Sequence, residues 1–200
     1  MGFLLGLQEY LAANYHLSVF DQAVESKDPY LFHLHGHRIV RATVVENLKY
    51  DIDLKTDEAT SPDLTHLPKT DVKLVYAAPL ADRVAPLLKV DQKVRDLHME
   101  PIIPAGKRHH IKNKSLFPLM KERSVVFFTL MEGEIVKGLI TGFSRYEITV
   151  SLKGNVPVVV LRHAVYDLRD KRGRCFLKSA QETHRDWERS RLFSPEDPAA

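Results

Sequence analysis

The chain has 200 residues, of which 44% are hydrophobic and 28% charged, and this composition excludes a disordered chain while fitting one medium or two small domains. Apolar runs such as Val156–Leu161 are too short to cross a bilayer, and the start of the chain has neither a basic region nor a cleavage site, so no membrane segment or signal peptide is expected. Cys175 is the only cysteine, which excludes an internal disulfide and multi-cysteine metal centres. We therefore expect a cytoplasmic protein.

The net charge of +3 is unevenly distributed. Residues 1–100 carry 11 Lys and Arg against 15 Asp and Glu, whereas residues 101–200 carry 18 against 11. A basic half is typical of contact with a polyanion such as nucleic acid, although a solvated surface with chance segregation of charge is an equal alternative.

The first part of the chain, residues 1–78, reads as a helix followed by β-structure. Apolar spacing predicts a helix within Phe3–Tyr15. Residues 56–70, with Ser61-Pro62 and Leu67-Pro68, are predicted to form a long loop. Four strands are expected around this loop, at Tyr30–Leu34, Ile39–Val45, Tyr50–Lys55 and Val72–Tyr76.

Residues 79–114 are predicted to be a partly helical, basic linker. Apolar residues in Leu87–Met99 have helical spacing and end before Pro101. The run KRHHIKNK at 107–114 supplies the basic character.

Residues 115–170 read as a short helix at Ser115–Lys121 followed by five short strands. Lys153-Gly154-Asn155 is a hairpin signal, and Gly138 and Gly142 indicate strong bending. The strands are expected at Val125–Leu130, Ile135–Gly142, Tyr146–Leu152, Val156–Leu161 and Ala164–Leu168. Residues 171–200 form a basic extension in which Ser179 and Glu182 predict a capped helix to about Leu192, before a frayed tail.

The two β-rich parts are related by an internal repeat. Ile39–Leu54 aligns without a gap to Ile135–Val150, 96 residues later. The identities include Tyr50 with Tyr146, and conservative matches include Lys49 with Arg145. The chain is therefore interpreted as an internal duplication.

The second repeat closely resembles the Sm-like barrel of the bacterial RNA chaperone family called host factor I, or Hfq. The resemblance covers about Ser115 to Asp170, and the first repeat shares it faintly. Its matching residues are Gly133, Gly138, Phe143, Tyr146, Leu152, Lys153 and the run Arg162-His163-Ala164-Val165. It implies an all-β-dominated fold of two tandem Sm-like, five-stranded, bent-sheet barrels, each preceded by a helix, with a helical linker and a C-terminal helix.

The resemblance also implies a site for single-stranded, uridine-rich RNA in the second repeat. Tyr146 matches the family's aromatic stacking platform, and Arg162-His163 matches its Lys-His pair. Arg145 replaces a glutamine that reads base edges, and Lys153 is a further expected contact. The alternative for Tyr146 is an aromatic residue that packs within the sheet.

Weaker RNA contacts are expected elsewhere. Tyr50 and Lys49 repeat the platform, but Ala77-Ala78 falls where the second repeat has Arg162-His163. A basic tail after the last strand adds nonspecific contacts from Arg169, Lys171, Arg172 and Arg174.

No catalytic residue, cofactor or metal is expected, because the chain has no nucleotide loop, nucleophile elbow or zinc motif. His33, His35 and His37 alternate, but Gly36 is predicted to lie in a turn that breaks the alternation. The family forms six-barrel rings, so we expect self-association, most simply three chains in a ring. The alternatives are a six-chain ring formed by the second repeat alone, and a monomer or dimer in which the two repeats of one chain pair with each other. The rival hypothesis is a protein-interaction module of the same fold without RNA binding.

Overall fold

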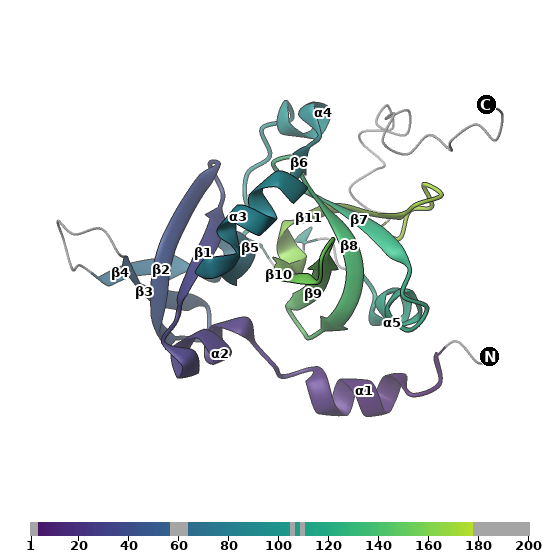
Figure 1. Cartoon of the computed structure of the whole chain (residues 1–200), viewed down its shortest axis with the longest axis horizontal. Helices are drawn as coiled ribbons and strands as arrows, with labels where there is room; N and C mark the ends of the chain where they lie inside the picture. Colours follow the sequence, from purple (N-terminus) through teal and green to yellow (C-terminus); the bar gives the residue numbers. More distant parts are fainter. Residues whose placement is uncertain (1–3, 57–63, 105–106, 109–110, 178–200) are drawn as a thin grey trace.

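The computed structural model describes residues 4–56, 64–104, 107–108 and 111–177. The predicted C-terminal helix and the His109-His110 pair lie outside these residues. Strands dominate the described part, and every strand pairing in it is antiparallel (Figure 1). None of the described helices is long and apolar enough to cross a membrane.

The described elements are divided between two β-rich halves and a connection. The first half contains α1 (Leu7–Asn14), α2 (Val19–Ser26), β1 (Pro29–Leu34), β2 (Arg38–Asn47), β3 (Asp51–Thr56), β4 (Leu64–Pro68), η2 (Lys69–Asp71) and β5 (Val72–Ala77). The connection contains η3 (Ala78–Leu80), α3 (Ala81–Val84), η4 (Ala85–Leu87), β6 (Lys89–Val90) and α4 (Gln92–Arg95). The second half contains α5 (Asn113–Lys121), β7 (Val125–Leu130), β8 (Glu134–Phe143), β9 (Glu147–Leu152), β10 (Val156–Leu161), η6 (Arg162–Ala164) and β11 (Val165–Asp170).

The expectation of two separate five-stranded barrels is wrong. The strands form one open, 11-stranded sheet in the order β11-β7-β8-β9-β10-β5-β1-β2-β3-β4, with β6 added beside β8. The two halves merge because β5 pairs with β10, where Val75 and Leu74 face Val159 and Val160. Strand propensity and turn signals predict which segments are strands, but they do not specify which sheet edges meet.

The repeat predicted from the sequence is present as two halves with the same element order. In each half a ten-residue second strand follows a turn, and the fifth strand returns beside the first. The first half has one strand more than predicted, because β4 forms within the expected loop at 56–70. Val72–Ala77 is therefore a fifth strand, and the repeat continues with an offset of 93 residues rather than 96 after the loop.

The predicted helix at Leu87–Met99 is replaced by shorter elements. Lys89 and Val90 pair with β8 as β6, and the Asp91 carboxylate caps the new helix α4 by accepting from the amides of Lys93 and Val94. Strand pairing with the distant β8 and this cap override the helical spacing of the apolar residues.

The hydrophobic core is shared across the contact between the halves. Leu74, Tyr76 and Val84 pack into the cluster of the second half, while Leu161 packs into that of the first. Each fully buried aliphatic side chain contributes about 1.5–3 kcal/mol to folding. The two halves therefore stabilise one another.

The turn predicted at Gly36 is confirmed, and Gly138 has a different role from the bending expected of it. Gly36 lies in the β1–β2 turn with a φ of 77°, so His33, His35 and His37 do not share one straight strand. Gly138 lies where β8 crosses β9 closely, since a Cβ atom there would be only 2.4 Å from the carbonyl oxygen of Ser151.

Candidate nucleic-acid interface

Tyr146 lies in the turn between β8 and β9, and its side chain is 61% exposed. The guanidinium of Arg145 is 5.1 Å from the centre of its ring, and the backbone amide of Arg145 donates to the carbonyl oxygen of Tyr15. The ring is therefore held at the surface rather than packed in the sheet. An exposed aromatic ring with an adjacent cation can stack on a nucleobase.

Arg162 follows β10 and lies next to this turn, because its amide donates to the carbonyl oxygen of Tyr146 (2.9 Å). Its side chain is only 6% exposed. The Nη1 atom donates to the carbonyl oxygen of Ile111 and to Oδ1 of Asn113, whereas Nε and Nη2 are buried without a hydrogen-bond partner in the described part of the chain. Burial lowers the pKa of Arg162 to about 10, so the side chain is still a cation at neutral pH.

His163 points toward the first half instead of the Tyr146 turn. Its Nε2 atom lies 2.9 Å from the carbonyl oxygen of Val72, which accepts a hydrogen bond from the neutral ring. Burial lowers the pKa of His163 to about 4, so the ring is neutral at physiological pH. This side chain fastens η6 to the start of β5.

The other predicted contacts are not brought together with Tyr146. Lys153 is in the β9–β10 turn, at the far end of the six-residue β9, which is about 20 Å long. Arg169 is buried and its Nε donates to Asp167 (2.9 Å). Lys171, Arg172 and Arg174 are exposed in the segment after β11.

The first half repeats the platform geometry closely. Tyr50 is 70% exposed, and the ammonium of Lys49 lies 5.1 Å from its ring centre. The amide of Lys69 donates to the carbonyl oxygen of Tyr50 (2.9 Å), just as the Arg162 amide donates to Tyr146. The position equivalent to Arg162 is therefore Lys69, and the assignment of Ala77-Ala78 to it is wrong.

The sequence comparison missed Lys69 because it read the segment as a loop. The first copy has a three-residue insertion before this point, and allowing for it matches Pro68-Lys69 to Leu161-Arg162. The Lys69 ammonium donates to the carbonyl oxygen of Leu48.

The two platforms differ in the charges beside them. Asp51 and Asp53 follow Tyr50, and Asp53 accepts from His66 (2.7 Å), which raises the pKa of that exposed imidazole. At the positions of these aspartates the second half has Glu147 and Thr149. The surroundings of Tyr50 are therefore less favourable for phosphate than those of Tyr146.

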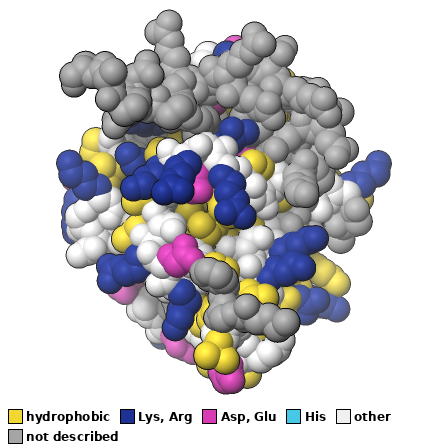
Figure 2. Space-filling view, turned by 90° about the vertical axis from the view of Figure 1, so that its right-hand side faces the viewer, with side chains coloured by type: hydrophobic (Ala, Val, Ile, Leu, Met, Phe, Trp, Pro, Cys, Tyr) yellow, Lys and Arg dark blue, Asp and Glu magenta, His cyan; other side chains and the backbone are white. Residues whose placement is uncertain are grey.

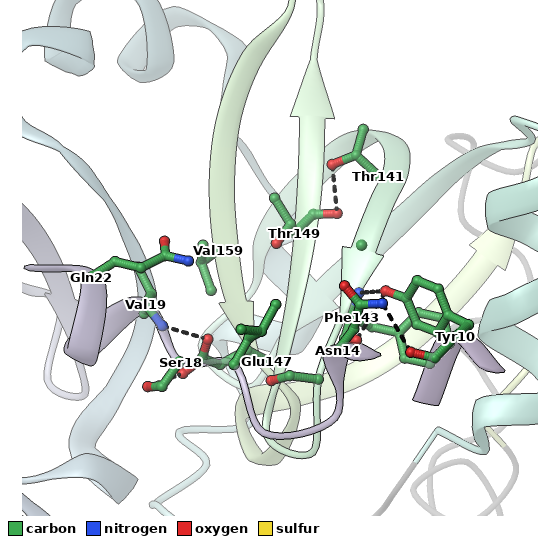
Figure 3. A pocket seen from close by; sticks show the side chains of 13 residues that line it. Tyr10, Asn14, Ser18, Val19, Gln22, Thr141, Phe143, Glu147, Thr149 and Val159 are labelled. Carbon is green, nitrogen blue, oxygen red and sulfur yellow. Dashed lines mark hydrogen bonds between the residues drawn. The ribbon is translucent and has the colours of Figure 1, made fainter. Parts of the chain in front are cut away.

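A pocket of about 220 Å³ lies beside the Tyr146 turn, between the α1–α2 connection and strands β8, β9 and β10 (Figure 3). Glu147 lies in its wall, accepting from the Ser18 hydroxyl and the Val19 amide at 2.8 Å each. Burial raises the pKa of Glu147 to about 6, although these bonds oppose the shift. This carboxylate docks the start of α2 on the sheet.

Tyr10 anchors α1 at the same pocket. Its hydroxyl accepts from the amide of Phe143 and donates to the carbonyl oxygen of the same residue. The Tyr10 and Phe143 rings are 4.7 Å apart between centres. The N-terminal helices thereby hold the turn that carries Tyr146.

Exposed basic side chains gather on the second half. Figure 2, which shows the end of the molecule formed by this half, has more Lys and Arg than Asp and Glu at its surface. Among the described residues of α5, β8 and the flanking turns, the exposed basic ones are Lys112, Lys114, Lys121, Arg123, Lys137 and Arg145. The basic residues of the second half are thus exposed on its surface.

One described cluster has the ligand types of a metal site. Ligand atoms of His37, Glu132 and Glu134 lie within 4.8 Å of one another. The ammonium of Lys73, which is fully buried, donates to both carboxylates, so a fixed cation already balances them. Burial alone would raise the pKa of Glu132, but hydrogen bonds from Lys73 and the Gly36 amide lower it. The cluster therefore acts as an ionic link between the halves.

Comparisons with known proteins leave the identity open. No model of a known protein family matches the chain, and no curated protein matches it.

Proposed function

We propose that this protein binds single-stranded RNA, with Tyr146 as the stacking platform and Arg162 as the adjacent hydrogen-bond donor. This extends the resemblance of the second repeat to the Hfq family of RNA chaperones. Uridine-rich RNA is the proposed ligand, and RNA chaperone activity is the proposed biological role.

The observation that carries the proposal is the state of Arg162. A buried guanidinium without a carboxylate partner is unfavourable, and the Phe143 ring, whose centre is 5.4 Å away, and the two hydrogen bonds of Nη1 repay its desolvation only in part. No salt bridge to Arg162 is found among the described residues, and two of its donor atoms are unpartnered. Both atoms are buried, so a base carbonyl or phosphate oxygen would satisfy them after the side chain rotates toward the Tyr146 turn.

The first half is proposed as a weaker site. Tyr50, Lys49 and Lys69 repeat the platform, but Asp51 and Asp53 stand where the second half has Glu147 and Thr149. Their negative charge opposes phosphate binding. Tyr50→Ala should therefore reduce RNA affinity less than Tyr146→Ala; equal losses would assign equal roles to both halves.

Fluorescence anisotropy with a labelled uridine-rich oligonucleotide tests the main site. Tyr146→Ala should weaken binding by about 1–3 kcal/mol per lost base stack, roughly 5- to 150-fold, whereas Tyr146→Phe retains the ring and should stay near wild type. Arg162→Met should also weaken binding, with thermal melting used to verify folding. Unchanged affinity in folded Tyr146→Ala would remove Tyr146 from the site.

A protein-interaction module without RNA binding is the second candidate, favoured by the extended sheet with strands at both edges. Salt dependence separates the two: RNA binding through phosphates requires a slope near −0.7 per neutralised charge. Absence of RNA binding even at low salt would favour the interaction module.

Self-association is also part of the proposal. The β5–β10 pairing joins a fifth strand to a fourth strand within one chain, and the equivalent strands β11 and β4 lie at the two ends of the sheet. Repeating that pairing between chains is head-to-tail and closes into a ring or grows into a filament; we propose a ring, most simply of three chains. Light scattering should give about 69 kDa, three times 22.9 kDa. A cytoplasmic location belongs to the same proposal.

A further inference from the structure

The edge of β11 is already occupied by the chain itself. After a turn at Gly173, whose φ is 77°, the segment Arg174–Leu177 runs back along β11. The Phe176 amide donates to the carbonyl oxygen of Leu168 (2.9 Å), and the Asp170 amide donates to the carbonyl oxygen of Arg174 (3.2 Å). We call residues 174–177 the strap.

The strap takes the place on β11 that β10 takes on β5. Phe128 on β7 and Phe32 on β1 are equivalent positions of the repeat. Leu168 lies opposite Phe128, and Val75 lies opposite Phe32, so Leu168 and Val75 are equivalent. Val75 is faced by Val159, and Leu168 by Phe176 in the same antiparallel sense. By this register Leu177 corresponds to Val160, and both are buried in the same hydrophobic cluster.

The counterpart is β4 at the other end of the sheet, which pairs only with β3 among the described strands (Figure 1). Strands β4 and β10 are aligned through their partners on β3 and β9. Pro68 lies opposite Asp51, and Leu161 lies opposite the equivalent residue Glu147. His66 on β4 therefore corresponds to Val159 on β10, and Leu67 corresponds to Val160. A second copy docking in the register of the β5–β10 pairing would place its His66 opposite Leu168. Its Leu67 would then need the position that Leu177 holds.

We infer that the strap is an autoinhibitory segment that competes with β4 of a second copy for the edge of β11. The inference rests on the self-association proposed above. Within the described residues the strap covers the edge of β11, and its displacement exposes a strand edge able to pair with another chain. Assembly is therefore tuned by how firmly residues 174–177 hold β11.

Two full-length variants loosen the strap in different ways. Gly173→Val places a β-branched residue at a positive φ and strains the turn without changing the core. Leu177→Asp removes the buried anchor. Lys171→Ala, at an exposed position of the same turn, is the matched control.

The readouts are the molar mass as a function of concentration and the labelling rate of Cys175. This lone thiol is half-buried in the strap, where it donates to the carbonyl oxygen of Leu177 (3.1 Å). Both variants should label faster and assemble at a concentration at least tenfold lower than wild type or Lys171→Ala. His66→Pro, added to either loosened variant, removes a backbone amide from the β4 edge. It should abolish assembly but leave the labelling rate of Cys175 high.

Two results would overturn the inference, and they differ. If loosened variants label faster yet assemble at the wild-type concentration, the strap does not compete and self-association stands. If neither the variants nor wild type assembles at any concentration, the proposed self-association fails, and the competition fails with it. RNA affinity of the second half is a separate measurement in either case.

Discussion

The buried imidazole of His163 makes the contact between the halves sensitive to acid. Its neutral ring donates to the carbonyl oxygen of Val72, and its pKa is lowered to about 4 by burial. In the unfolded chain the pKa of histidine is about 6.5. Because the folded pKa is the lower one, the unfolded state binds more protons between these values. The stabilisation is complete above pH 6.5 and is lost as the pH falls toward 4.

The size of the effect follows from the two pKa values. Protonation of this one residue lowers the free energy of unfolding by about 2 kcal/mol at pH 5 relative to neutral pH. His163→Gln retains a side-chain donor for the Val72 carbonyl but does not titrate. The variant should therefore lose about 2 kcal/mol less stability than wild type between pH 7.5 and pH 5.

Urea denaturation at the two pH values measures this difference. His98→Gln, at an exposed position, is the control and should follow wild type. His33, whose pKa burial also lowers to about 4, adds a loss of the same sign, while Glu147 adds a gain as the pH falls through about 6. Both are present in wild type and variant and cancel in the comparison. An identical pH dependence of wild type and His163→Gln would refute the reasoning.

Two further predictions concern packing. Lys73→Met leaves the carboxylates of Glu132 and Glu134 without their buried cation and should lower the free energy of unfolding by about 3–5 kcal/mol in chemical denaturation. The double variant Lys73→Met/Glu132→Gln should recover part of this loss. A Lys73→Met protein as stable as wild type would show that the ionic link contributes nothing. Gly138→Ala places a methyl group 2.4 Å from the Ser151 carbonyl oxygen and should cost about 1–3 kcal/mol in thermal unfolding, whereas an unchanged melting temperature would mean that β8 and β9 separate easily.

The candidate site was predictable in its local parts. The residue types at Tyr146 and Arg145 come from the sequence comparison of the two repeats, and the exposed ring agrees with a platform. Tyr146 was expected to begin the strand at Tyr146–Leu152, but it lies in the turn before β9. The burial of Arg162 was not predictable, because its partners Ile111 and Asn113 are about fifty residues away in the sequence. Its two unpartnered donors are visible only in three dimensions.

The sequence by itself determined the strand-rich character, the two-fold repeat and the turns at Gly36 and Lys153-Gly154-Asn155, because these depend on residues close together in the chain. It did not identify β4, whose proline and polar residues are typical of a loop, and this error misplaced the equivalent of Arg162. Only the tertiary structure decided that β5 meets β10 and that residues 174–177 cover β11. A strand edge pairs through backbone groups that are the same in every residue, so the sequence of an edge strand does not show which strand it pairs with. The packing of the two halves decides between two barrels and one sheet.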